Sequence, residues 1–423
     1  METVYSDYLL IEEVGNISGL FTPEELRELR EDFEEISSIY ERLIPSFIKT
    51  YLDETNIKDD YLNPKLRSKL ANEFNRSEEE LEREGLDFFQ AELPNIKRAI
   101  KKADSKKQWS SIIDICDSLI TFYNVRTYWE DLEETLQTAL TAAKKDKNKV
   151  AEARIYNNIA HTSRLLGRAK EGIDYGLNSY DIFCSLKNTE GKAESSYTLG
   201  YLYRSLGEWE DSIKYFENCL SLFKQLEDFV GEAGALDGLG QVYTKQENLD
   251  EAEKVLEESL RIKEEKVGDR FQISITLNNL GKVYKIKGNL EKAKNLFERS
   301  LKIKQQIEDR QGQGVSYNEL GVIYRLMKDY KQALEYFEKS LDIKKEVSSS
   351  GTGKATDNHG EGLTFMEIGT LYEETDKHEK ALINWKNALE KLNNYSPEFT
   401  RVTNYIKSLE AQMQQKATRK SYN

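Results

Sequence analysis

Four basic residues recur at regular positions along the chain and could bind an anion. The same interval leads from Arg164 to Arg204 and from Lys285 to Arg325, and about twice that interval separates Arg204 from Lys285. Arginine presents a planar fork of N–H donors that matches a carboxylate or a phosphate, and lysine supplies a compact positive charge. These residue types therefore allow binding of an acidic or phosphorylated ligand, provided that a repeating unit brings them together.

The sequence contains no pattern that is typical of an active site or a metal site. His161, His359 and His378 are scattered and have no acidic or cysteine partner at the spacing of metal ligands. The three cysteines stand beside apolar residues, so we expect them to pack as small core side chains. We therefore predict no catalytic activity, no cofactor and no metal.

One short segment, Gly351-Thr352-Gly353-Lys354, resembles part of a phosphate-binding loop. The full motif needs a further glycine at position 348, a serine or threonine after the lysine, and a preceding strand. Ser348 and Ala355 stand at those positions instead. We therefore interpret this segment as a flexible linker.

A recurring phrase defines the repeating unit. It consists of Leu or Ile, Gly, two variable positions and Tyr, and its glycines are Gly200, Gly240, Gly281, Gly321 and Gly369. A step of the same size back from Gly200 leads to Ala160. A second phrase, Ala-x3-aromatic, follows the glycine at Ala293, Ala333 and Ala381. Self-similarity of this period is typical of helical repeat arrays.

The two phrases predict a pair of antiparallel helices in each unit. Apolar residues recur at intervals of three and four in both halves of the unit. The small residues let the two helices approach closely, and polar turns such as Gly207-Glu208 and Asn248 separate them, because glycine or asparagine can end a helix in the left-handed conformation. About 300 residues without proline separate Pro94 from Pro397, as a continuous helical array requires.

The Leu-Gly-x2-Tyr and Ala-x3-Phe phrases resemble the signature of the tetratricopeptide repeat family over about residues 109–392. The resemblance implies an all-α fold, a right-handed superhelical α-solenoid of about seven helix pairs. The units are about 40 residues long instead of the usual 34, so each helix is expected to be about one turn longer. This variant is similar to that of Pins-type adaptors, kinesin light chains and the sensor arrays of STAND-type NTPases.

In that family the first helix of each pair faces a concave groove. The small residue of the first helix serves as the reference residue, and the resemblance implies that the positions three before, one after and four after it face inward. The four basic residues then form one row, in which Thr244 and Glu373 are the exceptions. Asparagines beside the row could pair with a peptide backbone. We predict a peptide-binding groove lined by Arg154, Asn157, His161, Arg164, Tyr197, Tyr201, Arg204, Gln241, Asn278, Lys282, Lys285, Asn318 and Arg325.

Charge and helix-start signals divide the chain into three predicted parts. Residues 1–90 hold 23 acidic and 10 basic side chains, whereas residues 91–423 hold 52 and 51. Capping signals at Thr22-Pro23-Glu24-Glu25 and at Ser77-x-x-Glu80 begin helices, so we predict an acidic helical domain or cap over residues 1–90. The solenoid follows over residues 91–395 with a flexible insertion at about 348–360, and residues 396–423 form a capping helix and a frayed basic tail.

The composition excludes several classes of protein. Hydrophobic residues make up 38% of the chain, which is too many for a disordered protein. No apolar run is long enough to span a membrane, and the first residues lack the features of a secretory signal, so we expect a cytoplasmic protein with no membrane partner. The net charge of −14 and the absence of a dense basic run argue against binding of nucleic acid.

We predict a non-catalytic protein–protein interaction scaffold or adaptor that binds an acidic or phosphorylated peptide, or a helix, in the groove. One alternative is a peptide-sensing regulatory receptor, similar in architecture to Rap-type quorum-sensing receptors, or a sensor module of a STAND-type signalling system. The acidic residues 1–90 could also occupy the groove themselves, since they carry the matching charge. The sequence identifies neither the partner nor the oligomeric state.

Overall fold

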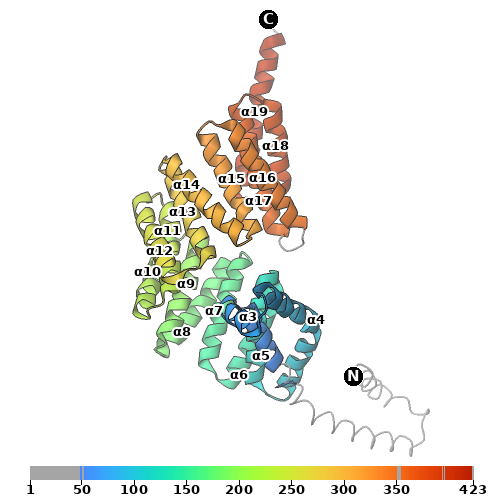
Figure 1. Ribbon diagram of the computed structural model, residues 1–423, viewed down its shortest axis with the longest axis vertical. Helices are drawn as coiled ribbons and strands as arrows, with labels where there is room; N and C mark the ends of the chain where they lie inside the picture. Colours follow the sequence, from blue (N-terminus) through green and yellow to red (C-terminus); the bar gives the residue numbers. More distant parts are fainter. Residues whose placement is uncertain (1–47, 50–51, 350–353, 393, 395, 422–423) are drawn as a thin grey trace, which may run out of the picture. The chain divides into compact units, whose positions relative to one another are not determined.

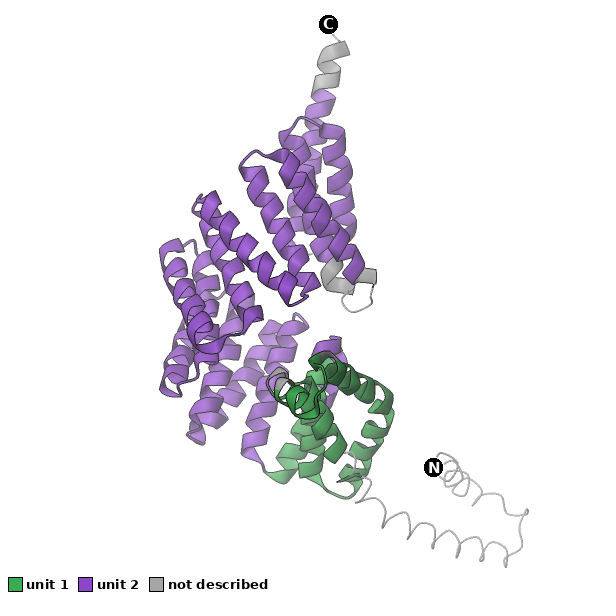
Figure 2. Cartoon of the chain, in the orientation of Figure 1, with its two compact units in different colours: residues 1–123, 138–147 green, residues 124–137, 148–423 purple. Residues whose placement is uncertain are grey.

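The computed structural model describes residues 48–49, 52–349, 354–392, 394 and 396–421 (Figure 1). Within these ranges almost every residue lies in a helix or a tight turn, and no strand occurs. The chain forms two compact units, residues 1–123 with 138–147 and residues 124–137 with 148–423 (Figure 2). The predicted all-α helical repeat solenoid is confirmed.

The helices before α7 belong largely to the first unit. They include α3 (Pro64–Phe74), α4 (Glu78–Ser105) and α5 (Trp109–Arg126), and α6 (Trp129–Asp146) is shared between the two units. The pair α5 and α6 lies within the region where the sequence predicts repeats. α4 begins with the predicted capping box. The Glu80 N–H donates to Ser77 Oγ over 3.1 Å, and the Ser77 N–H donates to the Glu80 carboxylate over 3.2 Å.

α4 continues through Pro94. A proline inside a helix removes one backbone hydrogen bond. Phe89 and Ile96 lie on either side of it and are completely buried, so burial of apolar surface stabilises the helix across the interruption. The predicted domain boundary at residues 90 and 91 lies inside this helix, and the three-part organisation stays a prediction.

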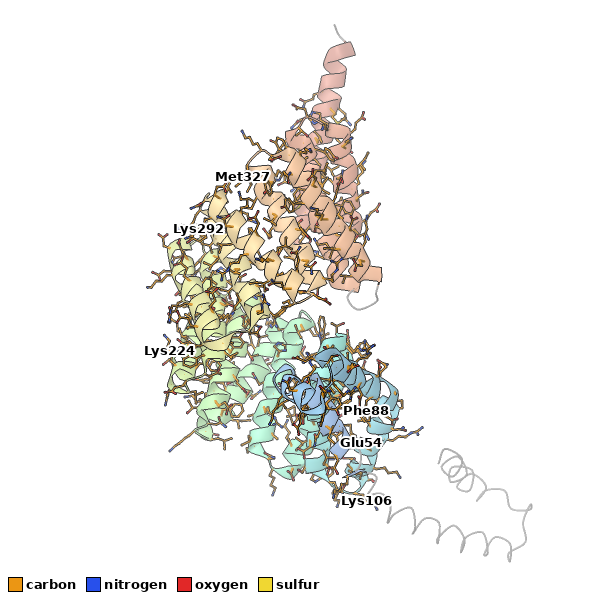
Figure 3. All side chains as sticks on the ribbon, viewed as in Figure 1. Glu54, Phe88, Lys106, Lys224, Lys292 and Met327 are labelled. Atoms are coloured by element: carbon orange, nitrogen blue, oxygen red, sulfur yellow. The ribbon has the colours of Figure 1, made fainter. Side chains whose placement is uncertain are left out.

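The second unit contains six successive helix pairs, of which the first helix is named A and the second B. They are α7 (Lys149–Leu165) with α8 (Ala169–Ser185), α9 (Thr189–Leu206) with α10 (Trp209–Gln225), α11 (Phe229–Lys245) with α12 (Leu249–Ile262), α13 (Arg270–Ile286) with α14 (Leu290–Gln306), α15 (Arg310–Leu326) with α16 (Tyr330–Ser349), and α17 (Lys354–Glu374) with α18 (His378–Lys391). Each helix packs against the next, and A helices also contact one another, α7 with α9, α9 with α11 and α11 with α13. Figure 3 draws the side chains on these helices, with Lys224 on α10 and Lys292 on α14 labelled.

The two repeated phrases meet inside each pair. A Cβ atom built on Gly281 would lie 2.7 Å from the ring of Phe297, and one on Gly321 would lie 2.5 Å from the ring of Phe337. The aromatic residue of the B helix therefore rests directly on the glycine of the A helix. The pair α7–α8 departs from this pattern, because Ala160 replaces the glycine and Gly176 stands where the aromatic residue would be. A Cβ atom on Gly176 would lie 2.8 Å from Leu199 of α9.

The turns follow one rule along the unit, and it differs from the prediction at one point. The first turn residue adopts a positive φ and the second occupies the N-cap position of the following helix. Gly207 has a φ of +77° as predicted and Gly288 one of +78°, but Asn248 does not adopt a positive φ, because φ is +60° at Glu247 and −82° at Asn248. Asn248 makes no side-chain capping bond, whereas Asp309 at the same position of its turn accepts the N–H of Gly312 over 2.8 Å.

The repeat between Gly240 and Gly281 is one residue longer than its neighbours, and the extra residue lies in a π-helical turn. This turn, η1 (Lys263–Val267), follows α12 and ends at Gly268, whose φ is +74°. Accordingly, the distance in sequence from Lys263 to Gly281 is one residue longer than that from Lys304 to Gly321. A π turn absorbs one residue without breaking the helix.

The ends of the second unit differ from the predictions in helix length. α16 has 20 residues and α17 has 21, against 17 in α15, so the predicted insertion at 348–360 lengthens both helices, and only residues 350–353 lie outside the described residues. α19 (Pro397–Ser421) is helical beyond Gln414, where we had predicted a frayed tail. It closes a core that includes Trp385 and Leu409. The helix predicted at Thr22-Pro23-Glu24-Glu25 lies outside the described residues.

Candidate functional site

The predicted groove residues all lie on A helices of the second unit, on α7, α9, α11, α13 and α15. Arg154 and His161 are exposed, Asn278 is buried, and the other ten are half-buried. We refer to this surface as the A-helix face. Its residues separate into two groups with different electrostatics.

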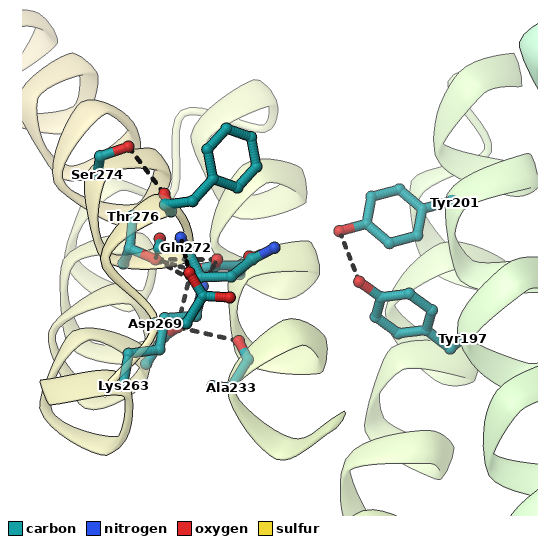
Figure 4. Close-up of polar contacts among 11 residues, drawn as sticks. Tyr197, Tyr201, Ala233, Lys263, Asp269, Gln272, Ser274 and Thr276 are labelled. Carbon is teal, nitrogen blue, oxygen red and sulfur yellow. Dashed lines mark hydrogen bonds and ion pairs between the residues drawn. The ribbon is translucent and has the colours of Figure 1, made fainter. Parts of the chain in front are cut away.

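The first group surrounds Tyr201. The guanidinium of Arg164 lies 5.6 Å from the centre of the Tyr201 ring, and that of Arg204 lies 5.1 Å from it. Tyr197 donates its hydroxyl to that of Tyr201 over 3.4 Å (Figure 4), and the two rings meet edge to face at 4.9 Å. His161 is 3.3 Å from Arg164. These five residues form the Arg–Tyr cluster.

Positive charge in the Arg–Tyr cluster lacks a counter-ion. Among the described residues, no carboxylate lies within ion-pair distance of Arg164 or Arg204, and Nε of Arg204 has no hydrogen-bond partner there. Burial lowers the pKa of Arg164, and the charge of Arg204 acts in the same direction. Two like charges are thus held together, which is costly unless an anion joins them.

His161 adds no positive charge to this cluster. Its side chain is solvent-accessible, and desolvation together with the charge of Arg164 lowers its pKa to about 4. A pKa of about 4 means that the imidazole is neutral at pH 7 and adds no charge to the cluster.

The second group comprises cations that the chain neutralises itself. Lys285 pairs with Glu319 over 2.6 Å, and Arg325 pairs with Glu367 over 2.9 Å and with Glu374 over 2.5 Å. Burial alone would raise the pKa of Glu319, but the charges of Lys285 and Lys282 lower it below its usual value. The predicted row of four cations is therefore not uniform, because two of its members are ion-paired.

Sequence reasoning missed these carboxylates, although a signal was present. Glu319 and Glu367 each stand two residues before a reference glycine. We had considered only the positions three before, one after and four after it. On a helix, a residue two positions before the glycine does not share its face. The side chain of a glutamate at that position is nevertheless long enough to reach a cation on the A-helix face.

Three asparagines carry unsatisfied carbonyl oxygens. Oδ1 of Asn157, Asn278 and Asn318 is buried without a hydrogen-bond partner among the described residues. All three stand three residues before their reference residue. At the same position, Asp237 is fully bonded: it accepts from Ser259 over 2.8 Å, from Lys263 over 2.5 Å and from Thr276 over 3.0 Å, in the region that Figure 4 draws.

A ladder of buried lysines connects successive pairs and was also missed. Lys263, Lys304 and Lys344 follow a serine by four residues in the phrase Ser-Leu-x-Ile-Lys, and they are 2%, 3% and 7% exposed. Each donates to a hydroxyl of the next A helix, on Thr276, Ser316 and Thr364 at 2.8, 3.0 and 2.7 Å. The recurring phrase could have revealed this ladder.

The remaining predicted residues join neither group closely. Arg154 lies near enough to Glu194 to oppose the burial and the Glu190 charge that raise the pKa of that carboxyl. Gln241 is half-buried on α11, between the two groups in the chain. Lys282 influences both Glu319 and the buried Lys304 electrostatically.

The structure offers little for catalysis or metal binding. No group of three His, Cys, Asp or Glu residues in the described ranges could hold a metal ion. Cys116 and Cys219 are buried as predicted, whereas Cys184 is only half-buried. Burial raises the pKa of the Cys219 thiol to about 12. A thiol of that pKa stays protonated and is a poor nucleophile. Among the described helices, none is long and apolar enough to cross a membrane.

Comparison with known proteins agrees with this architecture. The sequence model of the tetratricopeptide repeat family matches residues 191–265 and 272–346. A Rap protein complexed with competence and sporulation factor is similar with a TM-score of 0.54 at 12% identity, over 87% of this chain and 99% of that one. No curated protein matches the sequence.

Two further solved structures are similar. Aspartyl phosphate phosphatase F from Bacillus subtilis has a TM-score of 0.52 at 12% identity, over 83% of this chain and 95% of that one. The apo form of the quorum sensor NprR from B. thuringiensis has a TM-score of 0.51 at 17% identity, over 77% and 97%. At these sequence identities the similarity shows a shared fold and nothing more.

Proposed function

Because residues 191–265 and 272–346 match the tetratricopeptide repeat, we propose that the chain is a non-catalytic interaction scaffold whose A-helix face binds an acidic or phosphorylated segment of another protein. The observation that carries the proposal is the Arg–Tyr cluster, in which Arg164 and Arg204 flank one ring without a carboxylate partner in the described part of the chain. An anionic group of a partner would relieve their repulsion and fill the donors left open.

The asparagines support an extended peptide as the ligand. A peptide backbone offers an N–H and a C=O at every residue, and the half-buried side-chain amides of Asn157 and Asn318 are groups that could pair with them.

The energies are sufficient for useful affinity. Charge-assisted hydrogen bonds contribute about 1.5–3 kcal/mol each. Two of them, with apolar burial and backbone bonds, approach the roughly 8 kcal/mol of a micromolar complex.

A charge reversal tests this function. Arg164→Glu together with Arg204→Glu should abolish capture of the native partner from a host lysate, because carboxylates replace the anion-binding groups. Lys254→Glu with Lys302→Glu is the matched control, since both lysines are exposed on B helices. Unchanged capture by the Arg164/Arg204 variant, identified by mass spectrometry, would refute the proposal.

A second candidate is a regulator in which peptide binding to the repeats controls the helices of the first unit. It is motivated by similar proteins described as a quorum sensor and as a complex with a signalling factor. Small-angle scattering with and without a bound peptide distinguishes the two, because a rigid scaffold keeps its dimensions and a regulator does not.

A further inference from the structure

The two groups of cations on the A-helix face differ in whether a carboxylate of the described chain pairs with them, and this difference restricts the ligand. We infer that, within the row of four cations, only the α7–α9 part of this face accepts an anion, because Glu319, Glu367 and Glu374 already pair with Lys285 on α13 and Arg325 on α15. The inference rests on the proposed function and makes it more specific. The ligand is an extended peptide with acidic groups at one end and uncharged residues along the rest.

The internal carboxylates are built into the fold. The side chains of Lys285 and Glu319 are 23% and 14% exposed, and those of Arg325 and Glu367 are 12% and 19% exposed. A ligand carboxylate that approached Lys285 would exchange one charged hydrogen bond for another and would meet the charge of Glu319. The exchange yields no net gain, so these pairs exclude acidic residues.

The Arg–Tyr cluster has the opposite property. Tyr201 is fixed by edge-to-face contacts with Tyr197 and with Phe216 at 5.0 Å. The ring in turn positions Arg164 and Arg204, so the donors are preorganised for one anionic group. With His161 neutral, the cluster carries two positive charges, which match one phosphate or two carboxylates.

The stretch between the groups is uncharged at the row position. Thr244 occupies that position on α11 and bonds its own helix, donating to the carbonyl of Gly240 over 2.6 Å. Asn318 lies farther along, on α15, with a half-buried side-chain amide. Thr244 and Asn318 carry no charge, and an amide can pair with the backbone of an extended chain.

The helix spacing gives the length of the ligand. Packed helices lie about 8–10 Å apart, and three steps lead from α9 to α15, which corresponds to roughly 24–30 Å. An extended chain covers about 3.3 Å per residue. The acidic group and the far end of the bound segment are therefore about eight residues apart, and a dodecapeptide can span the face.

Selection from a random dodecapeptide library displayed on phage tests the inference directly. Full-length wild-type protein is immobilised, and the acidic content of each half of the enriched peptides is compared with that of the unselected library. We expect Asp and Glu to be enriched at least threefold in one half and to stay at the library level in the other. Glu319→Gln with Glu367→Gln should extend the enrichment to both halves.

Three further variants complete the experiment. Arg164→Gln with Arg204→Gln should remove the acidic enrichment, and Glu335→Gln, exposed on α16, should leave it unchanged. Thr244→Arg adds a cation in the uncharged stretch and should lengthen the acidic segment even if the glutamine variants fail to fold, which circular dichroism reports.

The outcomes separate the inference from the proposed function. Acidic enrichment in both halves of peptides selected by the wild-type protein would overturn the inference and leave the function standing. Unchanged selection by a folded Glu319/Glu367 variant would do the same. Absence of any acidic enrichment on the wild-type protein, together with unchanged partner capture by the Arg164→Glu/Arg204→Glu variant, would reject the proposed function itself.

Discussion

At the scale of single residues, neighbouring repeats provide a natural comparison of a buried lysine with and without a carboxylate. Lys263 pairs with Asp237 over 2.5 Å. At the equivalent place one pair later, Lys304 has Asn278 instead of an aspartate and bonds only the hydroxyl of Ser316 among the side chains described. Burial lowers the pKa of Lys304 to about 8. The difference between an aspartate and an asparagine at one position thus decides whether the buried lysine has a counter-ion.

Exchanging these partners should shift stability in opposite directions. Asp237→Asn leaves Lys263 without its counter-ion and should destabilise the fold by about 3 kcal/mol, because breaking a buried pair leaves an uncompensated charge. Asn278→Asp should stabilise it by supplying Lys304 with a carboxylate. Hydrogen exchange of the amides of α11 to α14 measures both effects, and a change of the same sign in both variants would contradict the comparison.

Lys304 should also make stability depend on pH. The pKa of Lys304 is about 8 in the folded state, against an ordinary value of 10.5, so between these values the unfolded chain binds more protons than the folded one. The free energy of unfolding therefore rises with pH through this window, by up to about 3 kcal/mol. Below pH 8 the penalty of the buried charge is fully present.

Lys304→Met isolates this contribution. Denaturant unfolding of both proteins at several values between pH 7 and pH 10 should show that the variant is relatively most stabilised at pH 7 and that its advantage shrinks as pH rises. A constant difference across the range would show that Lys304 keeps its ordinary pKa.

At the scale of helices, the contact between glycine and aromatic ring sets the spacing within each pair. The recurring Leu-Gly-x2-Tyr phrase exists because any Cβ at the glycine would collide with the partner helix, as the 2.5 Å approach to Phe337 shows for Gly321. In the pair α7–α8 both positions hold small residues, Ala160 and Gly176, and Leu199 of α9 packs against Gly176. Close packing, not the identity of either residue, is what the repeat preserves.

Two glycines of α15 should therefore respond differently to alanine. Gly321→Ala should destabilise the protein by about 1–3 kcal/mol, because an added methyl group overpacks the contact with Phe337. Gly314→Ala is the matched control, since the nearest atoms to its Cβ, on Ile343 and Lys344, would lie at an ordinary contact distance of 3.4 Å. Alanine also favours a helix over glycine by up to about 1 kcal/mol. Thermal unfolding of the two variants checks this, and equal effects would rule out the contact as the cause.

At the scale of the whole molecule, the acidic charge is concentrated in one part of the chain. The net charge is −14, of which residues 1–90 carry −13 (10 basic minus 23 acidic). Residues 91–423 are nearly neutral, so under the proposed function we expect Arg164 and Arg204 to supply the long-range attraction for an acidic ligand. Electrostatic attraction of this kind depends on ionic strength.

Binding of a selected acidic peptide should weaken several-fold when the salt concentration rises from about 0.1 M to about 1 M. The Debye length falls from about 10 Å to about 3 Å over this range, so the arginines attract the peptide less. Fluorescence anisotropy measures the dissociation constant at each concentration. The Arg164→Gln/Arg204→Gln variant should show little salt dependence, and a slope equal to that of the wild-type protein would place the binding elsewhere.

The amino-acid sequence by itself determined the fold and the surface on which to look. Periodic apolar residues, the long stretch without proline between Pro94 and Pro397 and the recurring glycine specify helix pairs locally, so the array and the capping box at Ser77 were predictable. Only the tertiary structure decided which cations are free. Ion pairing depends on side chains from different helices, such as Arg325 on α15 with Glu367 on α17, and no local pattern specifies which long side chains meet.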